Sequence, residues 1–311
     1  MKNCEWEGCG KEIPDDYGNL LCDEHYRELE AQNEAKAKEV VAEAVPAPEP
    51  PPSPVSSPSD PSKFGITDPN YQENPEKEDK EQWEANLSMF QRNGVLLWKP
   101  TRLIYTYIKD WCMGHIQEHP QFPKFLWRPR IVDVGCGIGV GSNVLSQEAD
   151  FVWGIDKNLK SIQFAKEAFE RNKNGIYYSS QVSFEHLDFM TDTRETMKFD
   201  CVVAVEVIEH IYDTHKFLKT MIEKFDKRKE GYEATTYFFS TPNRNNDSIR
   251  KDRPFNLYHV REYTSGEGFN YLSNYFGKVE LFSAAGVVIP ENEYQTTTHT
   301  PLLYKCSLPK L

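Results

Sequence analysis

The feature that most constrains this chain is a glycine-rich turn between an apolar strand and a helix. Residues 130–134 form a short apolar run, and glycines follow at positions 135, 137 and 139. Glycine lets the backbone turn sharply and approach a bound group closely, and the start of the following helix offers free backbone amides. The spacing D-x-G-x-G-x-G differs from the dinucleotide fingerprint G-x-G-x-x-G, because Val140 and Ser142 stand where that fingerprint requires glycine.

Acidic residues close the next two predicted strands. Asp156 follows the apolar run 151–155, about 20 residues beyond the glycines, where a carboxylate can accept both hydroxyls of a ribose. Asp188 closes the alternating run from Val182, where it can accept an exocyclic amine, and Phe189 beside it can pack on a purine. A glycine loop with two such carboxylates describes a nucleoside cofactor without a pyrophosphate. This combination favours S-adenosylmethionine over a nicotinamide dinucleotide.

Apolar strand runs alternate with helical patterns from about residue 82 onward. Strands are predicted at 130–134, 151–155, 182–189, 199–207, 235–240, 278–284 and 301–307, and helices at 82–92, 101–118, 139–147, 158–172, 213–227 and 264–276. This alternation predicts an α/β fold with a mostly parallel sheet that carries helices on both faces. In such a sheet ligands bind beyond the carboxyl ends of the strands.

Residues from about 95 to 285 resemble the class I S-adenosylmethionine-dependent methyltransferases. The matching segments are V-D-V-G-C-G-I-G at 132–139, G-I-D at 154–156, L-D-F at 187–189 and F-D-C-V-V-A-V-E-V-I-E-H at 199–210. The resemblance implies a Rossmann-like seven-stranded sheet whose last strand is antiparallel. It also implies that the glycine loop holds the methionine part of the cofactor, while Asp156 holds the ribose and Asp188 the adenine amine. The predicted cofactor-binding residues are Asp133, Gly135, Cys136, Gly137, Gly139, Asp156, Lys157, Asp188, Phe189 and Glu206.

A second group of polar residues follows the fourth strand run. In a helical turn Glu206, Glu209 and His210 would share one face, and His259 can join them from a later loop. Carboxylates and imidazoles together suit a hard divalent ion such as Mg²⁺. The segment is similar to the E-x-x-E-H segments of ubiquinone-biosynthesis O-methyltransferases and small-RNA 2′-O-methyltransferases, both of which act on one of two neighbouring hydroxyls. A metal-free site, with His210 or His259 as the general base, is equally compatible with the sequence.

The front of the chain has a different composition. Cys4, Cys9, Cys22 and His25 have a spacing that predicts a structural Zn²⁺ site in a unit too small to build a core. Residues 31–80 are acidic and proline-rich, which predicts an extended linker. We therefore expect a zinc-finger-like module at 1–30, this linker, and a methyltransferase domain at 81–311. The module would dock onto a nucleic acid or another protein.

The charge is distributed unevenly along the chain. Residues 1–80 carry 19 acidic and 8 basic side chains, a net of −11, whereas residues 81–311 carry 29 and 28, a net of −1. The larger part therefore lacks the basic excess of a dedicated nucleic-acid binder. No apolar run reaches the roughly 18 residues of a membrane span. The start of the chain lacks the apolar region of a secretory signal. An odd count of seven cysteines in 311 residues is no disulfide scaffold and fits a reducing, cytoplasmic compartment.

These features predict an S-adenosylmethionine-dependent methyltransferase that methylates a hydroxyl. The expected acceptor is a small molecule, a glycan or an RNA end, and a vicinal diol held by a metal ion is one form that the acceptor group can take. Two alternatives stay open. One is a non-catalytic, cofactor-binding adaptor that docks through the N-terminal module. The other is a nicotinamide-dependent oxidoreductase, which the missing glycine disfavours.

Overall fold

The computed structural model describes residues 99–115, 117–119, 122–170, 182–226, 235–246, 254, 256 and 258–310, together with the strands β1 (Lys2–Asn3), β2 (Glu12–Ile13) and β3 (Ile66–Thr67). The chain divides into two compact units, residues 1–53 and 54–311. In the first unit β1 and β2 form an antiparallel pair. The four predicted zinc ligands, the linker other than β3, and the predicted helix at 82–92 lie outside the described residues, so these expectations stay predictions.

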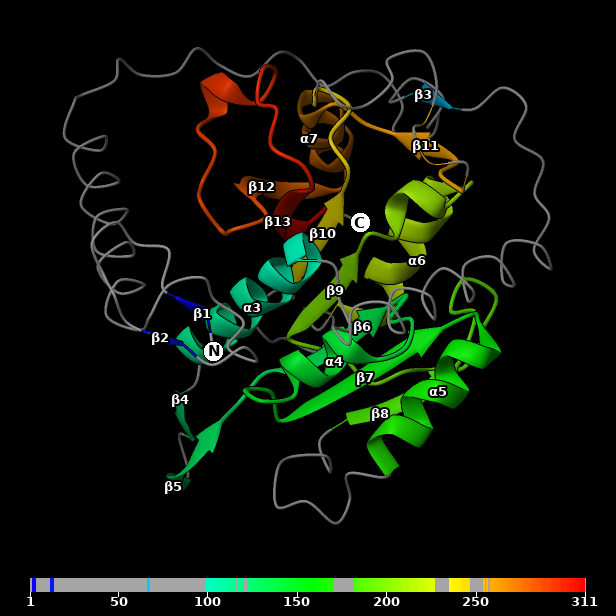
Figure 1. Cartoon of the computed structure of the whole chain (residues 1–311). Coiled ribbons are helices and arrows are strands. Elements are labelled where there is room, and N and C mark those ends of the chain that lie inside the picture. The colour runs from blue at the N-terminus through cyan, green and yellow to red at the C-terminus, as the bar shows by residue number, and fades with distance from the viewer. Residues whose placement is uncertain are drawn as a thin grey trace. The chain divides into compact units, whose positions relative to one another are not determined.

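The second unit is built on a seven-stranded sheet with the order β12-β13-β10-β9-β6-β7-β8 (Figure 1). Its strands are β6 (Arg130–Val134), β7 (Phe151–Asp156), β8 (Val182–His186), β9 (Cys201–Val205), β10 (Thr236–Thr241), β12 (Phe276–Ser283) and β13 (Leu302–Pro309). The five neighbouring strands β10, β9, β6, β7 and β8 run parallel to one another, and β13 is antiparallel to both β10 and β12. The expected mixed sheet with an antiparallel last strand is confirmed.

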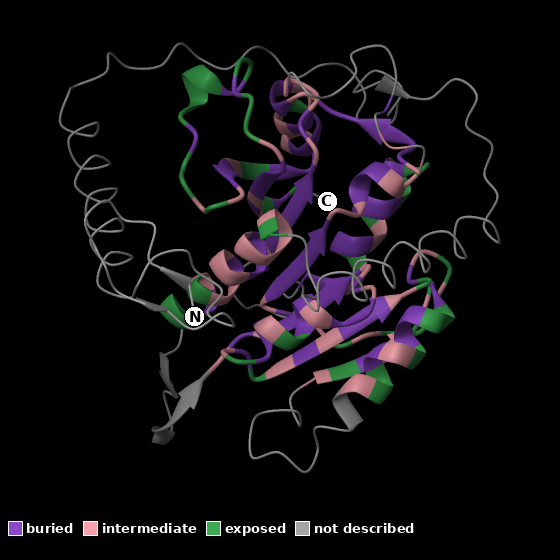
Figure 2. Ribbon diagram, viewed as in Figure 1, coloured by how far each residue is buried: buried purple, intermediate pink, exposed green. Residues whose placement is uncertain are grey.

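Helices cover both faces of this sheet (Figure 1). On one face lie α3 (Lys99–Gly114), α4 (Val140–Leu145) and α5 (Leu159–Glu170), and on the other lie α6 (Thr214–Phe225) and α7 (Ser265–Ser273). The residues of β9 alternate accordingly, since Cys201 and Val203 pack with α3 while Val202 and Ala204 pack with α6. All of β9 is buried, as a strand covered on both faces requires (Figure 2).

Two segments differ from the expectations. The helix predicted at 101–118 ends at Gly114, and β4 (Gln117–His119) instead pairs antiparallel with β5 (Phe122–Trp127). Glycine at 114 and proline at 120 both disfavour continuation of the helix. The strand predicted at 182–189 ends at His186, so Asp188 and Phe189 lie in the turn that follows β8.

Two short elements complete the region near the carboxyl ends of the strands. The 3₁₀ turn η4 (Ile208–His210) follows β9, and β11 (Arg261–Glu262) pairs antiparallel with β3. A second 3₁₀ turn, η6 (Glu291–Glu293), precedes β13. None of the described helices has the length and apolar character needed to cross a membrane.

Candidate cofactor and metal site

The loop between β6 and α4 turns sharply at three glycines. Gly135, Gly137 and Gly139 have φ angles of 70°, 53° and 82°, a left-handed conformation that glycine adopts without steric cost. The amides of Gly135 and Cys136 both donate to the carbonyl of Ile155, at 2.8 and 3.1 Å. These bonds hold the loop against the end of β7, at the carboxyl edge of the sheet.

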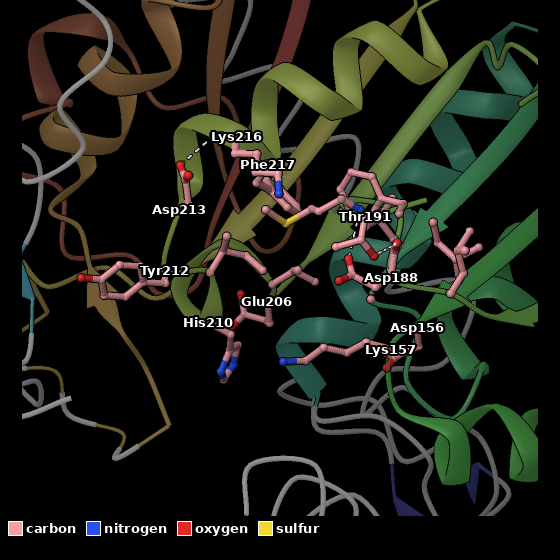
Figure 3. Close-up of a pocket in the computed structure, with 18 of the residues that line it drawn as sticks. Asp156, Lys157, Asp188, Thr191, Glu206, His210, Tyr212, Asp213, Lys216 and Phe217 are labelled. Carbon is pink, nitrogen blue, oxygen red and sulfur yellow. Dashed lines mark hydrogen bonds between the residues drawn. The ribbon is translucent and has the colours of Figure 1, made fainter. Parts of the chain in front are cut away.

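A cavity of about 360 Å³ opens at this edge, beside the ends of β6, β7 and β9 (Figure 3). Five of the predicted polar site residues line it, namely Asp156, Lys157, Asp188, Glu206 and His210. In Figure 3 the side chain of Lys157 extends across the cavity toward Glu206. The position and size are those expected of a ligand site in an α/β sheet.

Backbone amides hold the two predicted cofactor carboxylates in place. Asp156 accepts from the amide of Asn158 at 2.7 Å through Oδ1 and from the amide of Gly137 at 2.9 Å through Oδ2. Asp188 accepts from the amide of Met190 at 3.0 Å. A carboxylate oxygen has further lone pairs, so both groups can still accept a ligand hydroxyl or amine.

An aromatic wall lies next to Asp188. Phe189 lines the cavity and is 5% exposed. Its ring packs edge-on against Phe217, with the ring centroids 5.4 Å apart, and Phe217 also lines the cavity. A planar apolar group beside a fixed carboxylate suits a purine ring that carries an amine.

Four predicted cofactor residues do not line the cavity: Asp133, Cys136, Gly137 and Gly139. Asp133 is fully buried and accepts from Ser142 Oγ at 2.7 Å and from Tyr105 Oη at 3.1 Å. Burial raises the pKa of Asp133 to about 7, although these two hydrogen bonds oppose the shift. Asp133 therefore links the strand before the glycine loop to Tyr105 of α3 and Ser142 of α4, on the side away from the cavity.

Cys136 also faces away from the cavity. Its side chain packs in a small buried cluster with Ile162, Ala165 and Phe184. Burial raises the pKa of this thiol well above its usual value, which keeps it protonated and unreactive. The part that Cys136 plays in the site is confined to its backbone amide.

Glu206 adopts a conformation that few side chains tolerate. Its φ angle is 55°, its amide donates to both the carbonyl and the Oγ of Ser240, and its Oε1 accepts from that Oγ at 2.7 Å. Burial raises the pKa of Glu206 to about 7, and the Ser240 bond opposes this. A strained residue at a cavity wall is characteristic of functional sites.

The structure brings Glu209, His210 and His259 together. One ligand atom of each lies within 4.8 Å of the others. Glu206 does not join this group, contrary to the expectation, because its left-handed backbone removes it from the 3₁₀ turn that carries Glu209 and His210. The predicted four-residue set therefore becomes a set of three, with Glu206 on the neighbouring cavity wall.

Glu209 is a buried carboxylate, 1% exposed. Neither of its oxygens has a hydrogen-bond partner among the described residues, and the nearby hydroxyl of Thr241 is also unpartnered there. Burial raises the pKa of Glu209 well above its usual value, and the negative charge of Glu206 adds to the shift. A buried, unsatisfied carboxylate of this kind needs a proton or a cation.

The two imidazoles present their second nitrogen atoms. His210 Nδ1 lies 2.9 Å from the carbonyl oxygen of Tyr258 and must donate to it, which leaves the lone pair on Nε2. The centroid of the His259 ring lies 4.9 Å from that of the His210 ring, and the two ring planes make an angle of 85°. Burial, together with the charges of His259 and Lys157, lowers the pKa of His210 to about 3, so this imidazole is neutral near pH 7.

Sequence reasoning missed the residues that hold this group in place. Ser240, Tyr258 and Glu262 each bond to a predicted site residue. Only Glu262 has a local signal, because it follows His259 by three positions. The other two contacts join segments more than 30 residues apart and have no sequence signature.

Comparisons with known proteins agree with this geometry. Residues 129–252 match the family model described as a methyltransferase domain. A ubiquinone biosynthesis O-methyltransferase of Methylobacterium sp. (strain 4-46) is 34% identical over 121 residues, which are 39% of this chain and 45% of that protein. Its counterpart in Erwinia tasmaniensis is 31% identical over 151 residues, 48% of this chain and 54% of that protein.

The chain thus spans about half the length of the curated relatives it matches. A solved S-adenosylmethionine-dependent methyltransferase from Clostridium acetobutylicum covers 73% of this chain and 99% of its own, with 11% identity and a TM-score of 0.49. The family model covers the glycine loop, both cofactor carboxylates and the Glu206–His210 segment. Residues 129–252 therefore carry the features of a methyltransferase domain.

Proposed function

We propose that this chain is an S-adenosylmethionine-dependent O-methyltransferase whose acceptor is one hydroxyl of a vicinal pair. The observation that carries the cofactor assignment is the open cavity with Asp156 and Asp188 on its wall, next to the glycine loop. The residues fit the cofactor, because Asp156 can accept ribose hydroxyls while Asp188 and Phe189 suit an adenine. The preference for oxygen as the acceptor atom rests on the O-methyltransferase relatives.

The reaction requires little covalent chemistry from the protein. The acceptor oxygen attacks the methyl carbon in line, the carbon–sulfur bond breaks, and the hydroxyl proton passes to a base. In a site without metal, the Nε2 lone pair of His210 can take that proton, because Nδ1 already donates to Tyr258. The main task of the protein is to align the two reactants, and such alignment supplies much of the rate enhancement.

Glu209, His210 and His259 can hold a divalent metal ion. They offer one carboxylate and two imidazole nitrogens, and the carboxylate is buried without a hydrogen-bond partner among the described residues. An ion bound there would lower the pKa of a coordinated hydroxyl. The acceptor would then be a diol on a small molecule, a glycan or an RNA end.

Calorimetric titration with S-adenosylhomocysteine and with NAD tests the cofactor assignment. We expect binding of S-adenosylhomocysteine alone, weakened about 10- to 100-fold in Asp156→Asn, because a hydrogen bond to a charged group contributes about 1.5–3 kcal/mol. Asp150→Asn, an exposed residue of the same type, is the matched control and should bind normally. Binding of neither ligand would favour the adaptor, and binding of NAD would favour the oxidoreductase.

Removal of metal tests the second part of the proposal. We expect methyl transfer to a catechol acceptor to fall on treatment with EDTA, to recover with Mg²⁺, and to lose its Mg²⁺ dependence in Glu209→Ala. Activity that EDTA leaves unchanged would exclude the metal. In that case His210 or His259 would serve as a general base without it.

A further inference from the structure

Glu262 is a buried carboxylate beside the candidate metal site, outside both the cavity lining and the predicted ligand set. The residue is 1% exposed, and its Oε1 lies 2.6 Å from Nδ1 of His259, which is itself 8% exposed. An ionised carboxylate can only accept a hydrogen bond. In a neutral His259 ring the hydrogen therefore lies on Nδ1.

The other nitrogen of this ring has a partner that points to the same tautomer. The side-chain amide nitrogen of Asn256 lies 3.2 Å from His259 Nε2. An amide NH₂ group donates, so Nε2 accepts and carries the lone pair. Two contacts on opposite edges of the ring thus agree, and a cation or an acceptor proton at Nε2 would take the place of the Asn256 contact.

The main chain fixes where His259 stands. The amide of Val260 donates to the carbonyl of Glu209 at 2.8 Å, and the carbonyl of Tyr258 accepts from His210 at 2.9 Å. Each sequence neighbour of His259 is therefore bonded to one member of the candidate metal set: Val260 to Glu209, and Tyr258 to His210. What the main chain leaves undetermined is the orientation and the tautomer of the His259 ring.

We propose that Glu262 is a positioning residue that holds His259 in the Nδ1–H tautomer and directs the Nε2 lone pair to the side of Glu209 and His210. A carboxylate behind a ligating imidazole fixes its orientation and raises the basicity of the opposite nitrogen. Glu262 thereby sets the affinity of the site for a divalent ion. The part of this inference that concerns metal affinity rests on the proposed function, and the part that concerns the tautomer does not.

The tautomer is measured by nitrogen NMR of the full chain labelled with ¹⁵N-histidine, with His259→Gln used to assign the signal. We expect the Nδ1–H form in the unaltered protein and in Glu262→Gln, whose amide oxygen still accepts. Glu262→Leu removes the acceptor and should populate the Nε2–H form. An unaltered protein in the Nε2–H form would overturn the tautomer assignment. A Glu262→Leu variant with an unchanged proportion of the Nδ1–H form would overturn the role of Glu262, because Asn256 alone would then set the tautomer.

Titration with Mn²⁺ tests the effect on metal affinity. We expect Glu262→Gln to weaken Mn²⁺ binding about 10- to 100-fold, as other carboxylate partners of ligating imidazoles do, with no change in the affinity for S-adenosylhomocysteine. Glu280→Gln is the matched control, since it alters charge equally on β12, where Glu280 pairs with Lys278 and Lys305. Equal Mn²⁺ affinity in Glu262→Gln and the unaltered protein would refute this role.

Two further measurements separate the ways in which this test can fail. S-adenosylhomocysteine binding and thermal unfolding show whether each variant is folded. Glu262→Asp keeps the charge and shortens the reach, so it provides a second variant that should weaken Mn²⁺ binding. If the unaltered protein binds no Mn²⁺, the metal proposal fails, and the NMR result still decides whether Glu262 sets the tautomer.

Discussion

Gly135 lies so close to Val207 that a Cβ atom on Gly135 would stand 2.6 Å from Cγ2 of Val207. Gly135 also has a φ angle of 70°. We expect Gly135→Ala to destabilise the protein by roughly 2–5 kcal/mol, because a left-handed non-glycine residue costs about 1–2 kcal/mol and overpacking about 1–3 kcal/mol. Urea unfolding measures this, and S-adenosylhomocysteine affinity should fall with it because the loop must shift.

The double variant Gly135→Ala, Val207→Ala separates the two causes. Truncation of Val207 removes the crowding and leaves the backbone strain at position 135. The double variant should therefore be more stable than the sum of the two single changes predicts, by the roughly 1–3 kcal/mol that overpacking costs. Strict additivity would show that Val207 does not crowd this position.

Asp133 makes the stability of the protein depend on pH. Burial raises the pKa of this group to about 7 in the folded protein, from an ordinary value of 3.8. Between these values the folded state holds a proton on Asp133 that the unfolded state has lost. The contribution of Asp133 to the free energy of unfolding is therefore greatest at low pH and falls as the pH rises from about 4 to about 7. A shift of about three units corresponds to roughly 4 kcal/mol at most.

The variant Asp133→Asn lacks this titration and isolates its effect. We expect the stability of the unaltered protein relative to Asp133→Asn to decrease between pH 4.5 and pH 7.5, measured by urea unfolding across that range. An amide oxygen at the position of Oδ2 still accepts from Ser142, and the hydroxyl of Tyr105 lies 3.4 Å from the same atom, so the fold of the variant should be preserved. A constant difference across the range would show that Asp133 titrates normally.

The sheet and the cofactor wall follow from local sequence. The strands β6, β7, β9 and β10 are apolar runs that must be buried, and each glycine or acidic residue at their ends sits where a parallel sheet exposes it to a ligand. Such features depend on neighbours in the chain, and Asp156 and Asp188 accordingly line the cavity.

The fine geometry of the second group depends on distant residues and could not be predicted. The backbone of Glu206 leaves the helical turn because its amide bonds to Ser240, 34 residues away. In the same way, Val260 and Tyr258 fix His259 and His210 through bonds that only the folded chain creates. A periodicity argument places Glu206 and Glu209 on one face, and these long-range bonds override it.

The N-terminal module allows a test that is independent of the catalytic domain. The spacing of Cys4, Cys9, Cys22 and His25 predicts one Zn²⁺ per chain. We expect elemental analysis of the purified full chain to find that stoichiometry, and Cys22→Ser to abolish it without loss of S-adenosylhomocysteine binding. Cys306→Ser, at a buried cysteine in β13, should keep its zinc. Purified full chain that contains no zinc would contradict the prediction of a zinc-finger-like module at residues 1–30.

The left-handed backbone of Glu206 predicts an unusual order of stability among its variants. Glu206→Ala and Glu206→Gly both remove the carboxylate and its bond to Ser240, and they differ only in the Cβ atom at a φ angle of 55°. Because a Cβ atom in this conformation costs about 1–2 kcal/mol, the glycine variant should be the more stable by roughly 1 kcal/mol once its greater unfolded-state entropy is included. Urea unfolding of the two proteins measures the difference directly. Their affinities for S-adenosylhomocysteine should be equal, since the same cavity wall is altered in both. An alanine variant as stable as the glycine variant would mean that the backbone at 206 is not left-handed, and Glu206 would then return to the face that carries Glu209 and His210.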